Sequence, residues 1–171
     1  MELNDLASRL AEVARLSGSF RLRSGQTASV YFDKYQFESD PELLGAVAEA
    51  MVDLIPDDTE LLAGLELGGV PVATALALAS GLHVVFVRKK RKEYGTAKLA
   101  EGSSIKGKRL LVVEDVVTTG GQVVSSTQQL RERGAVVTTA ACVIDREEGG
   151  AEALAEIGVT LKPLFRRSDL G

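Results

Sequence analysis

Two adjacent carboxylates, Glu114 and Asp115, end an apolar run in the segment VVEDVVTTGG, residues 112–121. Two threonines and the glycines Gly120 and Gly121 follow, at the expected start of a helix. The first N–H groups of a helix lack internal partners, and glycine lets an anion approach them, so this composition predicts a phosphate site. Carboxylates would repel that phosphate unless they bind sugar hydroxyls, a divalent cation or a developing positive charge. A ribose phosphate would satisfy both halves of the segment, whereas the alternative is an ordinary strand end followed by an ordinary helix start.

Five consecutive cations, Arg88 to Lys92, open a glycine-containing polar segment that we expect to form a mobile loop over about 88–107. Crowded like charges favour a polyanion, so a diphosphate is a natural target for part of this run. A loop of this kind can also close, exclude water and bring cations onto a leaving group. The alternatives are a solvated loop and a nucleic-acid patch.

Other phosphate-binding motifs fit the chain less well. The segment GSSIKGKR, residues 102–109, spaces its glycines and lysine like a Walker A loop. Arg109 stands where the magnesium-binding Ser or Thr belongs, however, and the segment precedes an expected strand instead of following one. No GxGxxG follows any expected strand, so the dinucleotide fingerprint is also missing.

The elements that position these residues alternate between strands and helices. A helix over 3–16, a strand over 29–35 and a helix over 41–54 come first. Strands are then expected at 60–66, 83–89, 109–115, 135–145 and 159–165, with helices at 70–80, 121–134 and 151–158. Because the strands are apolar on both faces, we predict an α/β fold with a parallel sheet covered on both sides. Ligands in such sheets collect at the carboxyl ends of the strands, where the charged segments lie.

The composition suits a single domain spanning residues 1–171, since 45% of the 171 residues are hydrophobic. A formal net charge of −4 argues against a broad attraction to nucleic acid or to an anionic membrane. The single cysteine, Cys142, lies in an apolar stretch and is expected to be a buried side chain and no nucleophile. The charged N-terminal segment and the lack of a long apolar run predict a cytoplasmic protein.

The segment VVEDVVTTGG resembles the phosphoribosyl diphosphate (PRPP) signature of type I phosphoribosyltransferases. The segments RLRSGQTASVYFDKYQF, GLELGGVPVATALA, VRKKRKEYGTAKLAEG and VIDREEGG resemble those of orotate phosphoribosyltransferases in order and spacing. The resemblance covers nearly the whole chain, and the basic loop with the late DR pair is more specific than the PRPP signature. It implies a mostly parallel central sheet flanked by helices, a small N-terminal hood over about 1–40 and a mobile loop over about 88–107.

The implied reaction joins orotate and PRPP to give orotidine 5′-monophosphate and pyrophosphate, in the biosynthesis of UMP. The resemblance implies Mg²⁺, carried mainly by PRPP, with Asp115 as the one candidate for a direct protein contact. It also implies a homodimer whose loop residues reach the partner's site, with no nucleic-acid or membrane partner. Two alternatives stay open: a PRPP-binding regulator on the same fold, and a purine phosphoribosyltransferase. Arg146 argues against a purine phosphoribosyltransferase, because a purine has no carboxylate with which this arginine could pair.

The same resemblance assigns residues to roles. Lys89, Asp115 and Glu114 are the catalytic candidates, the two carboxylates holding the ribose hydroxyls and facing the cationic ring. The predicted PRPP contacts are Arg88, Lys89, Lys92, Tyr94, Glu114, Asp115, Val116, Val117, Thr118, Thr119, Gly120, Gly121 and Gln122. The predicted orotate contacts are Thr118, Arg146, Arg23, Tyr31 and Phe32. Arg146 would pair with the orotate carboxylate.

Three positions depart from the family pattern. Tyr94 stands where many members have a loop histidine, so proton transfer at this position is not expected. Gly68 stands where some members have a lysine, which leaves backbone amides for the pyrophosphate. Arg23 replaces a common lysine and keeps its charge with a different shape.

Overall fold

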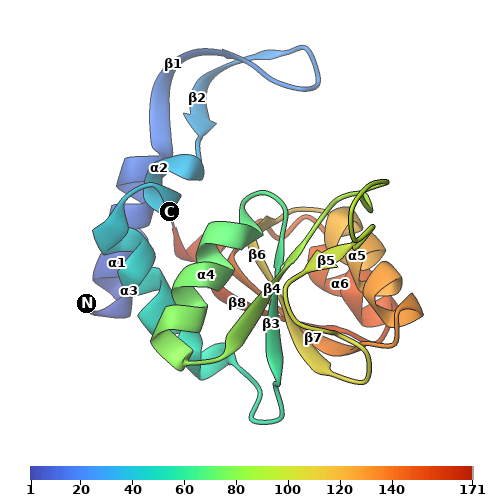
Figure 1. Cartoon of the computed structure of the whole chain (residues 1–171). Coiled ribbons are helices and arrows are strands. Elements are labelled where there is room, and N and C mark those ends of the chain that lie inside the picture. The colour runs from blue at the N-terminus through green and yellow to red at the C-terminus, as the bar shows by residue number, and fades with distance from the viewer. Residues whose placement is uncertain (171) are drawn as a thin grey trace.

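A six-stranded sheet forms the centre of the molecule, as seen in a computed structural model that describes residues 1–170 (Figure 1). The strand order is β5-β4-β3-β6-β7-β8, and every neighbouring pair is parallel except β4 and β5. The strands are β3 (Leu61–Leu65), β4 (His83–Val87), β5 (Ala100–Glu101), β6 (Arg109–Val117), β7 (Val136–Asp145) and β8 (Thr160–Arg166). The predicted α/β class with a mostly parallel sheet is therefore confirmed.

Helices cover both faces of this sheet. The helices α1 (Leu3–Ala14), α3 (Pro41–Met51) and α4 (Gly69–Ser80) lie on one face, and α5 (Gly121–Glu132) and α6 (Gly150–Glu156) lie on the other (Figure 1). Successive residues of β6 point to opposite faces, so Leu111 and Val113 pack in one hydrophobic cluster while Leu110 and Val112 pack in the other. The strands are therefore apolar on both faces because helices cover both sides of the sheet, as we expected from the sequence.

The N-terminal region holds a β-hairpin, of which the sequence analysis predicted only the second strand. Strands β1 (Arg15–Arg21) and β2 (Thr27–Phe32) pair antiparallel and stand away from the main sheet (Figure 1). The predicted helix to residue 16 ends at Ala14, and the predicted strand over 29–35 ends at Phe32 because Tyr35 begins helix α2 (Tyr35–Glu38). Strand β1 was missed because most of its residues are exposed, so no alternation of apolar and polar residues marks it.

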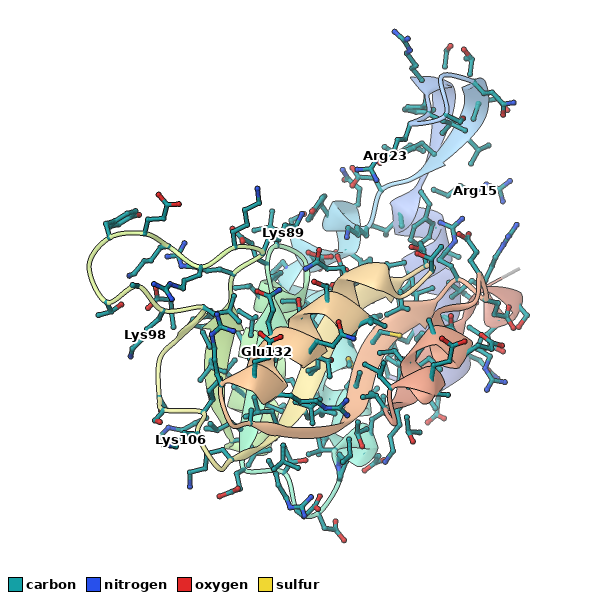
Figure 2. The ribbon with its side chains drawn as sticks, turned by 90° about the vertical axis from the view of Figure 1, so that its right-hand side faces the viewer. Arg15, Arg23, Lys89, Lys98, Lys106 and Glu132 are labelled. Carbon is teal, nitrogen blue, oxygen red and sulfur yellow. The ribbon has the colours of Figure 1, made fainter. Side chains whose placement is uncertain are left out.

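The basic loop is shorter than predicted. Strand β5 pairs with β4 through Val87 and Ala100, and Leu99 and Ile105 are buried, so the chain returns to the body well before residue 107. Figure 2 shows Lys89 near the body and the chain between it and Lys98 looping outward. The mobility of this loop and the single-domain organisation stay predictions.

Two further expectations concern single residues. Asp40 caps α3 as predicted, its carboxylate accepting from Glu42 N at 2.9 Å and from Leu43 N at 3.1 Å. A 3-10 turn, η1 (Val52–Leu54), extends this helix, and a second, η2 (Arg167–Asp169), follows β8. Cys142 is free and fully buried, as expected. Within residues 1–170, no helix has both the length and the apolar character required to cross a membrane.

Candidate active site

The PRPP-like segment forms a turn between β6 and α5, and we call its residues 114–122 the β6–α5 corner. Gly120 adopts a left-handed conformation, with φ at 81°, immediately before α5 begins at Gly121. No side chain caps this helix, and its first internal hydrogen bond runs from Val124 N–H to Gly120 O. The preceding N–H groups are therefore available to an anion, and the exposed hydroxyls of Thr118 and Thr119 flank them.

The start of α6 packs tightly against this corner. A Cβ at Gly150 would lie 2.5 Å from Val117 Cγ1 and 2.8 Å from Thr118 O, so the position accepts only glycine without rearrangement. Arg146, just before this helix, donates its backbone N–H to Val117 O at 2.9 Å. The structure thus places Arg146 beside the β6–α5 corner, although the two are almost thirty residues apart in sequence.

At the end of β6, the two carboxylates of the corner are buried among charged partners. The Asp115 side chain is 0% exposed, and its Oδ1 accepts from Val116 N at 2.6 Å. Lys34, which lies between β2 and α2, places its Nζ 2.6 Å from Asp115 Oδ2, at an angle outside that of a hydrogen bond, so the contact is an ion pair. Glu38 is also buried, and neither of its carboxylate oxygens has a hydrogen-bond partner within residues 1–170.

These contacts set the charge of the site. Burial alone would raise the pKa of Asp115, but its contacts with Glu38 and Lys34 bring that pKa below its ordinary value. Burial, with Asp115 adding to it, raises the pKa of Glu114 well above its ordinary value and that of Glu38 to about 9. The raised pKa values of Glu114 and Glu38 favour their protonated forms, and the Asp115 carboxylate is paired with Lys34. Both effects reduce the repulsion between these acids and a nearby phosphate.

The turn between β3 and α4 closes the other side of Asp115. A Cβ on Gly68 would overlap the Asp115 carboxylate, and a Cβ on Gly69 would overlap Val113 O. The φ of Gly68 is −64°, a conformation open to any residue, so the constraint at this position is space and not backbone geometry. The lack of a side chain at position 68 therefore lets this turn lie against the acidic pair.

The variant Gly68→Ala tests this packing. Because Asp115 is buried and held by Lys34, its carboxylate cannot move aside, and we expect kcat/KM for PRPP to fall about 10- to 100-fold, the range of a roughly 1–3 kcal/mol overpacking cost. Gly45→Ala is the matched control, because a Cβ there meets no atom within 4 Å. Steady-state kinetics that give both variants the same kcat/KM would contradict the close packing.

Two of the loop cations are paired with an acid on β5. This acid is Glu101, and its Oε1 lies 3.2 Å from Arg88 Nε and 2.8 Å from Lys92 Nζ. Lys89 donates its backbone N–H to Glu66 Oε2 at 2.8 Å while its side chain is exposed, and Tyr94 is 74% exposed. Figure 2 shows the loop on the side of the molecule opposite the hairpin that carries Arg15 and Arg23. The predicted PRPP contacts of this loop therefore stay predictions.

A cavity of about 350 Å³ lies between the hairpin and the core, and we call it the hairpin cavity. Its lining residues are Ala11, Glu12, Arg15, Val30, Phe32, Ile144, Arg146, Arg167 and Leu170. It brings together two of the predicted orotate contacts, Phe32 and Arg146. Tyr31 is not among the lining residues, and its ring packs on Phe20 with centroids 5.5 Å apart. Arg23, exposed in the hairpin turn, and Thr118 do not line it either.

Five charged residues near these sites were missed in the sequence: Lys34, Glu38, Glu12, Arg15 and Arg167. Lys34 and Glu38 contact Asp115 from about eighty residues away, and no local pattern marks such a contact. Arg15, the first residue of β1, and Arg167, the first residue of η2, both line the hairpin cavity although they are far apart in the sequence. Arg15 would have been found if strand β1 had been predicted.

The described residues do not form a metal cage. Within residues 1–170, no three His, Cys, Asp or Glu side chains gather in a geometry that could hold a metal ion. Asp115, the candidate for a direct contact, is fully enclosed and paired with Lys34. The expectation that magnesium is carried mainly by PRPP, with Asp115 as a possible contact, stays a prediction.

Comparisons with known proteins agree with this geometry. Residues 35–163 match the phosphoribosyl transferase domain family. An orotate phosphoribosyltransferase from Nocardioides sp. (strain ATCC BAA-499 / JS614) is 52% identical over 165 residues, covering 96% of this chain and 92% of that protein.

Two solved structures of the Mycobacterium tuberculosis H37Rv orotate phosphoribosyltransferase resemble this one along nearly its whole length. The complex with Fe(III) dicitrate has a TM-score of 0.90 at 33% identity, and the complex with PRPP has a TM-score of 0.85 at 31% identity. Each comparison covers 99% of this chain and 98% of the other. The chain therefore belongs to the phosphoribosyltransferase family, in its orotate phosphoribosyltransferase group.

Proposed function

We propose that this protein transfers the phosphoribosyl group of PRPP to orotate, giving orotidine 5′-monophosphate and pyrophosphate in pyrimidine biosynthesis. The observation that carries the proposal is the β6–α5 corner, where buried carboxylates and free helix N–H groups adjoin at one turn. Its relatives with this name, and a related structure that holds PRPP, support the proposal. A cytoplasmic location stays a prediction.

The 5-phosphate of PRPP would bind the N–H groups at the start of α5 and the hydroxyls of Thr118 and Thr119. The ribose hydroxyls would then face Glu114 and Asp115. Direct contact with Asp115 requires the Lys34 ammonium to move aside, which its flexible stem and 32% exposure allow. As the bond to the diphosphate breaks, positive charge develops on the sugar, and the ionised Asp115 stabilises it.

The leaving diphosphate needs cations. Magnesium bound to PRPP supplies part of this neutralisation, and we propose that Lys89, Arg88, Lys92 and Tyr94 supply contacts when the loop closes. Since the loop projects away from the hairpin of its own chain, we propose a homodimer in which it serves the partner's site (Figure 2). Release of Glu101 from Arg88 and Lys92 would free those two cations for the diphosphate.

The base would bind in the hairpin cavity. Phe32 offers an apolar wall, and Arg146 can pair with the carboxylate of orotate after leaving Glu148, whose Oε1 lies 3.2 Å from its Nη2. A purine offers no carboxylate to this arginine, so the cavity favours an acidic pyrimidine. Arg23, Tyr31 and Thr118 would contact the base only if the hairpin folds down toward the β6–α5 corner.

A panel of bases tests the proposed function directly. Purified protein is mixed with PRPP, Mg²⁺ and one base at a time, and the release of pyrophosphate is followed. We expect release with orotate and none with adenine, guanine, hypoxanthine or uracil. Release with a purine would show a purine phosphoribosyltransferase, and PRPP binding with no turnover of any base would show a regulator.

The variant Arg146→Gln tests the base site. Loss of a charge-assisted contact is worth about 1.5–3 kcal/mol, so we expect kcat/KM for orotate to fall about 10- to 100-fold. The KM for PRPP should stay within about twofold, because Arg146 meets the β6–α5 corner through its backbone. Initial rates measured at varied orotate and varied PRPP separate the two effects. An unchanged orotate KM with a raised PRPP KM would place the carboxylate elsewhere.

A further inference from the structure

Lys34 connects the N-terminal region to the buried carboxylate at the end of β6. It lies between β2, which ends at Phe32, and α2, which begins at Tyr35. Its Nζ is 2.6 Å from Asp115 Oδ2 and 5.3 Å from the centroid of the Tyr35 ring, so an ion pair and a cation–π contact both hold it. One long side chain therefore connects the segment between β2 and α2 with Asp115 in the β6–α5 corner.

Asp115 has little freedom within this arrangement. Val116 N–H holds Oδ1, Lys34 lies against Oδ2, and Gly68 leaves no space beyond the carboxylate. Buried Glu38 approaches from α2 and brings no positive charge. Lys34 is thus the one side chain in ion-pair contact with Asp115 in the described part of the chain, and it restrains Oδ2 of the carboxylate.

Stability alone does not explain such a pair. Removing two charges from water costs about as much as their attraction returns, and apolar replacements of buried pairs are often neutral or stabilising. The Asp115 side chain is 0% exposed, whereas Lys34 keeps one third of its surface in contact with solvent. The Lys34 side chain therefore contacts both the buried carboxylate and solvent.

We infer that Lys34 is a positioning residue for PRPP: its ammonium fixes the orientation of Asp115 and cancels the charge of that carboxylate while the phosphates approach. The inference rests on the proposed function only in naming PRPP as the ligand. PRPP carries several negative charges, so an unpaired Asp115 next to its binding place would repel it. Lys34 removes that repulsion while PRPP approaches, and its ammonium then moves aside so that the ribose hydroxyls can reach the carboxylate.

The test is a double-mutant cycle read out as PRPP binding. The dissociation constant of PRPP with Mg²⁺ is measured by calorimetry, without any base, for the wild type, Lys34→Met, Asp115→Asn and the double variant. We expect Lys34→Met to weaken PRPP binding about 10- to 100-fold, as for the loss of a contact to a charged group. Because Lys34 acts through Asp115, the same change in the Asp115→Asn background should cost less than about threefold.

Two further variants separate positioning from a structural role. Lys34→Arg keeps the charge and should restore binding to within about fivefold of the wild type. Lys108→Met is the matched control, since Lys108 forms a surface ion pair with Glu60 at 3.0 Å and should leave PRPP binding unchanged. If Lys34→Met does not fold, Lys34→Gln takes its place in the cycle with the same criteria.

The result that would overturn the inference is equally specific. Unchanged PRPP binding in Lys34→Met, or an equal loss with and without Asp115, would show that Lys34 does not act through that carboxylate. Failure of the proposed function gives a different pattern, because the wild type would then bind PRPP without releasing pyrophosphate from it with orotate. The cycle remains decisive in that case, since it measures binding alone.

Discussion

Asp115→Asn is expected to lower kcat/KM about 100- to 1,000-fold, the loss typical of a group that stabilises transition-state charge. The substitution keeps the shape of the side chain and removes its negative charge at the place where the sugar becomes cationic. Because Asp115 is enclosed and held by Lys34 and Val116, no other carboxylate can take over its position. Initial rates of pyrophosphate release at varied PRPP and saturating orotate measure the effect.

The fold has to be checked separately in this variant, because Asp115→Asn leaves the half-buried ammonium of Lys34 without its partner. Near-ultraviolet circular dichroism and the melting temperature show whether the structure survives. The double variant Lys34→Met/Asp115→Asn removes both charges and should recover any lost stability without recovering turnover. Asp58→Asn is the control, because Asp58 pairs with Arg109 on the surface at 3.2 Å. Turnover of Asp115→Asn within about threefold of the wild type would remove Asp115 from the mechanism.

Lys89→Ala is expected to lower kcat about 100- to 1,000-fold while the melting temperature stays unchanged. The side chain of Lys89 is exposed, and only its backbone N–H is bonded, to Glu66, so truncation leaves β4 and its neighbours intact. The loss is expected because Lys89 would neutralise the departing diphosphate. Lys90→Ala is the control, since Lys90 is an exposed neighbour in the same basic run and has no proposed contact.

Mixing the two inactive proteins tests whether the loop serves the partner. If Lys89 acts in the neighbouring subunit's site, a mixed dimer of Lys89→Ala and Asp115→Asn contains one intact site. Random exchange should then restore about a quarter of wild-type turnover. No recovery after subunit exchange, verified by mass spectrometry of the mixture, would place Lys89 in the site of its own chain.

The sequence predicted the sheet well because its strands carry their own signal. Runs such as HVVFV and RLLVV are apolar on both faces, and the structure places them as β4 and β6 at the centre of a sheet covered on two sides. The turn at Gly120 and Gly121 was predictable for a similar reason, since glycine before a helix follows from local geometry, whereas phosphate binding there stays a prediction. Local rules therefore gave the fold class and half of the candidate site.

The other half depends on contacts between distant segments. Nothing in the residues around Lys34 indicates that its ammonium meets Asp115, and nothing around Gly68 indicates that its missing side chain makes room for that carboxylate. Strand β1 is exposed and is stabilised by pairing with β2, so it lacks the apolar pattern that reveals a buried strand. Such features follow from how the hairpin, the β3–α4 turn and β6 meet, which only the folded chain shows.

A crystal structure of the protein with ribose 5-phosphate tests the central claim most directly. We predict the phosphate on the N–H groups that begin α5, beside Thr118 and Thr119, with the ribose hydroxyls directed toward Glu114 and Asp115. A phosphate bound anywhere else, with the β6–α5 corner free of ligand, would contradict the account.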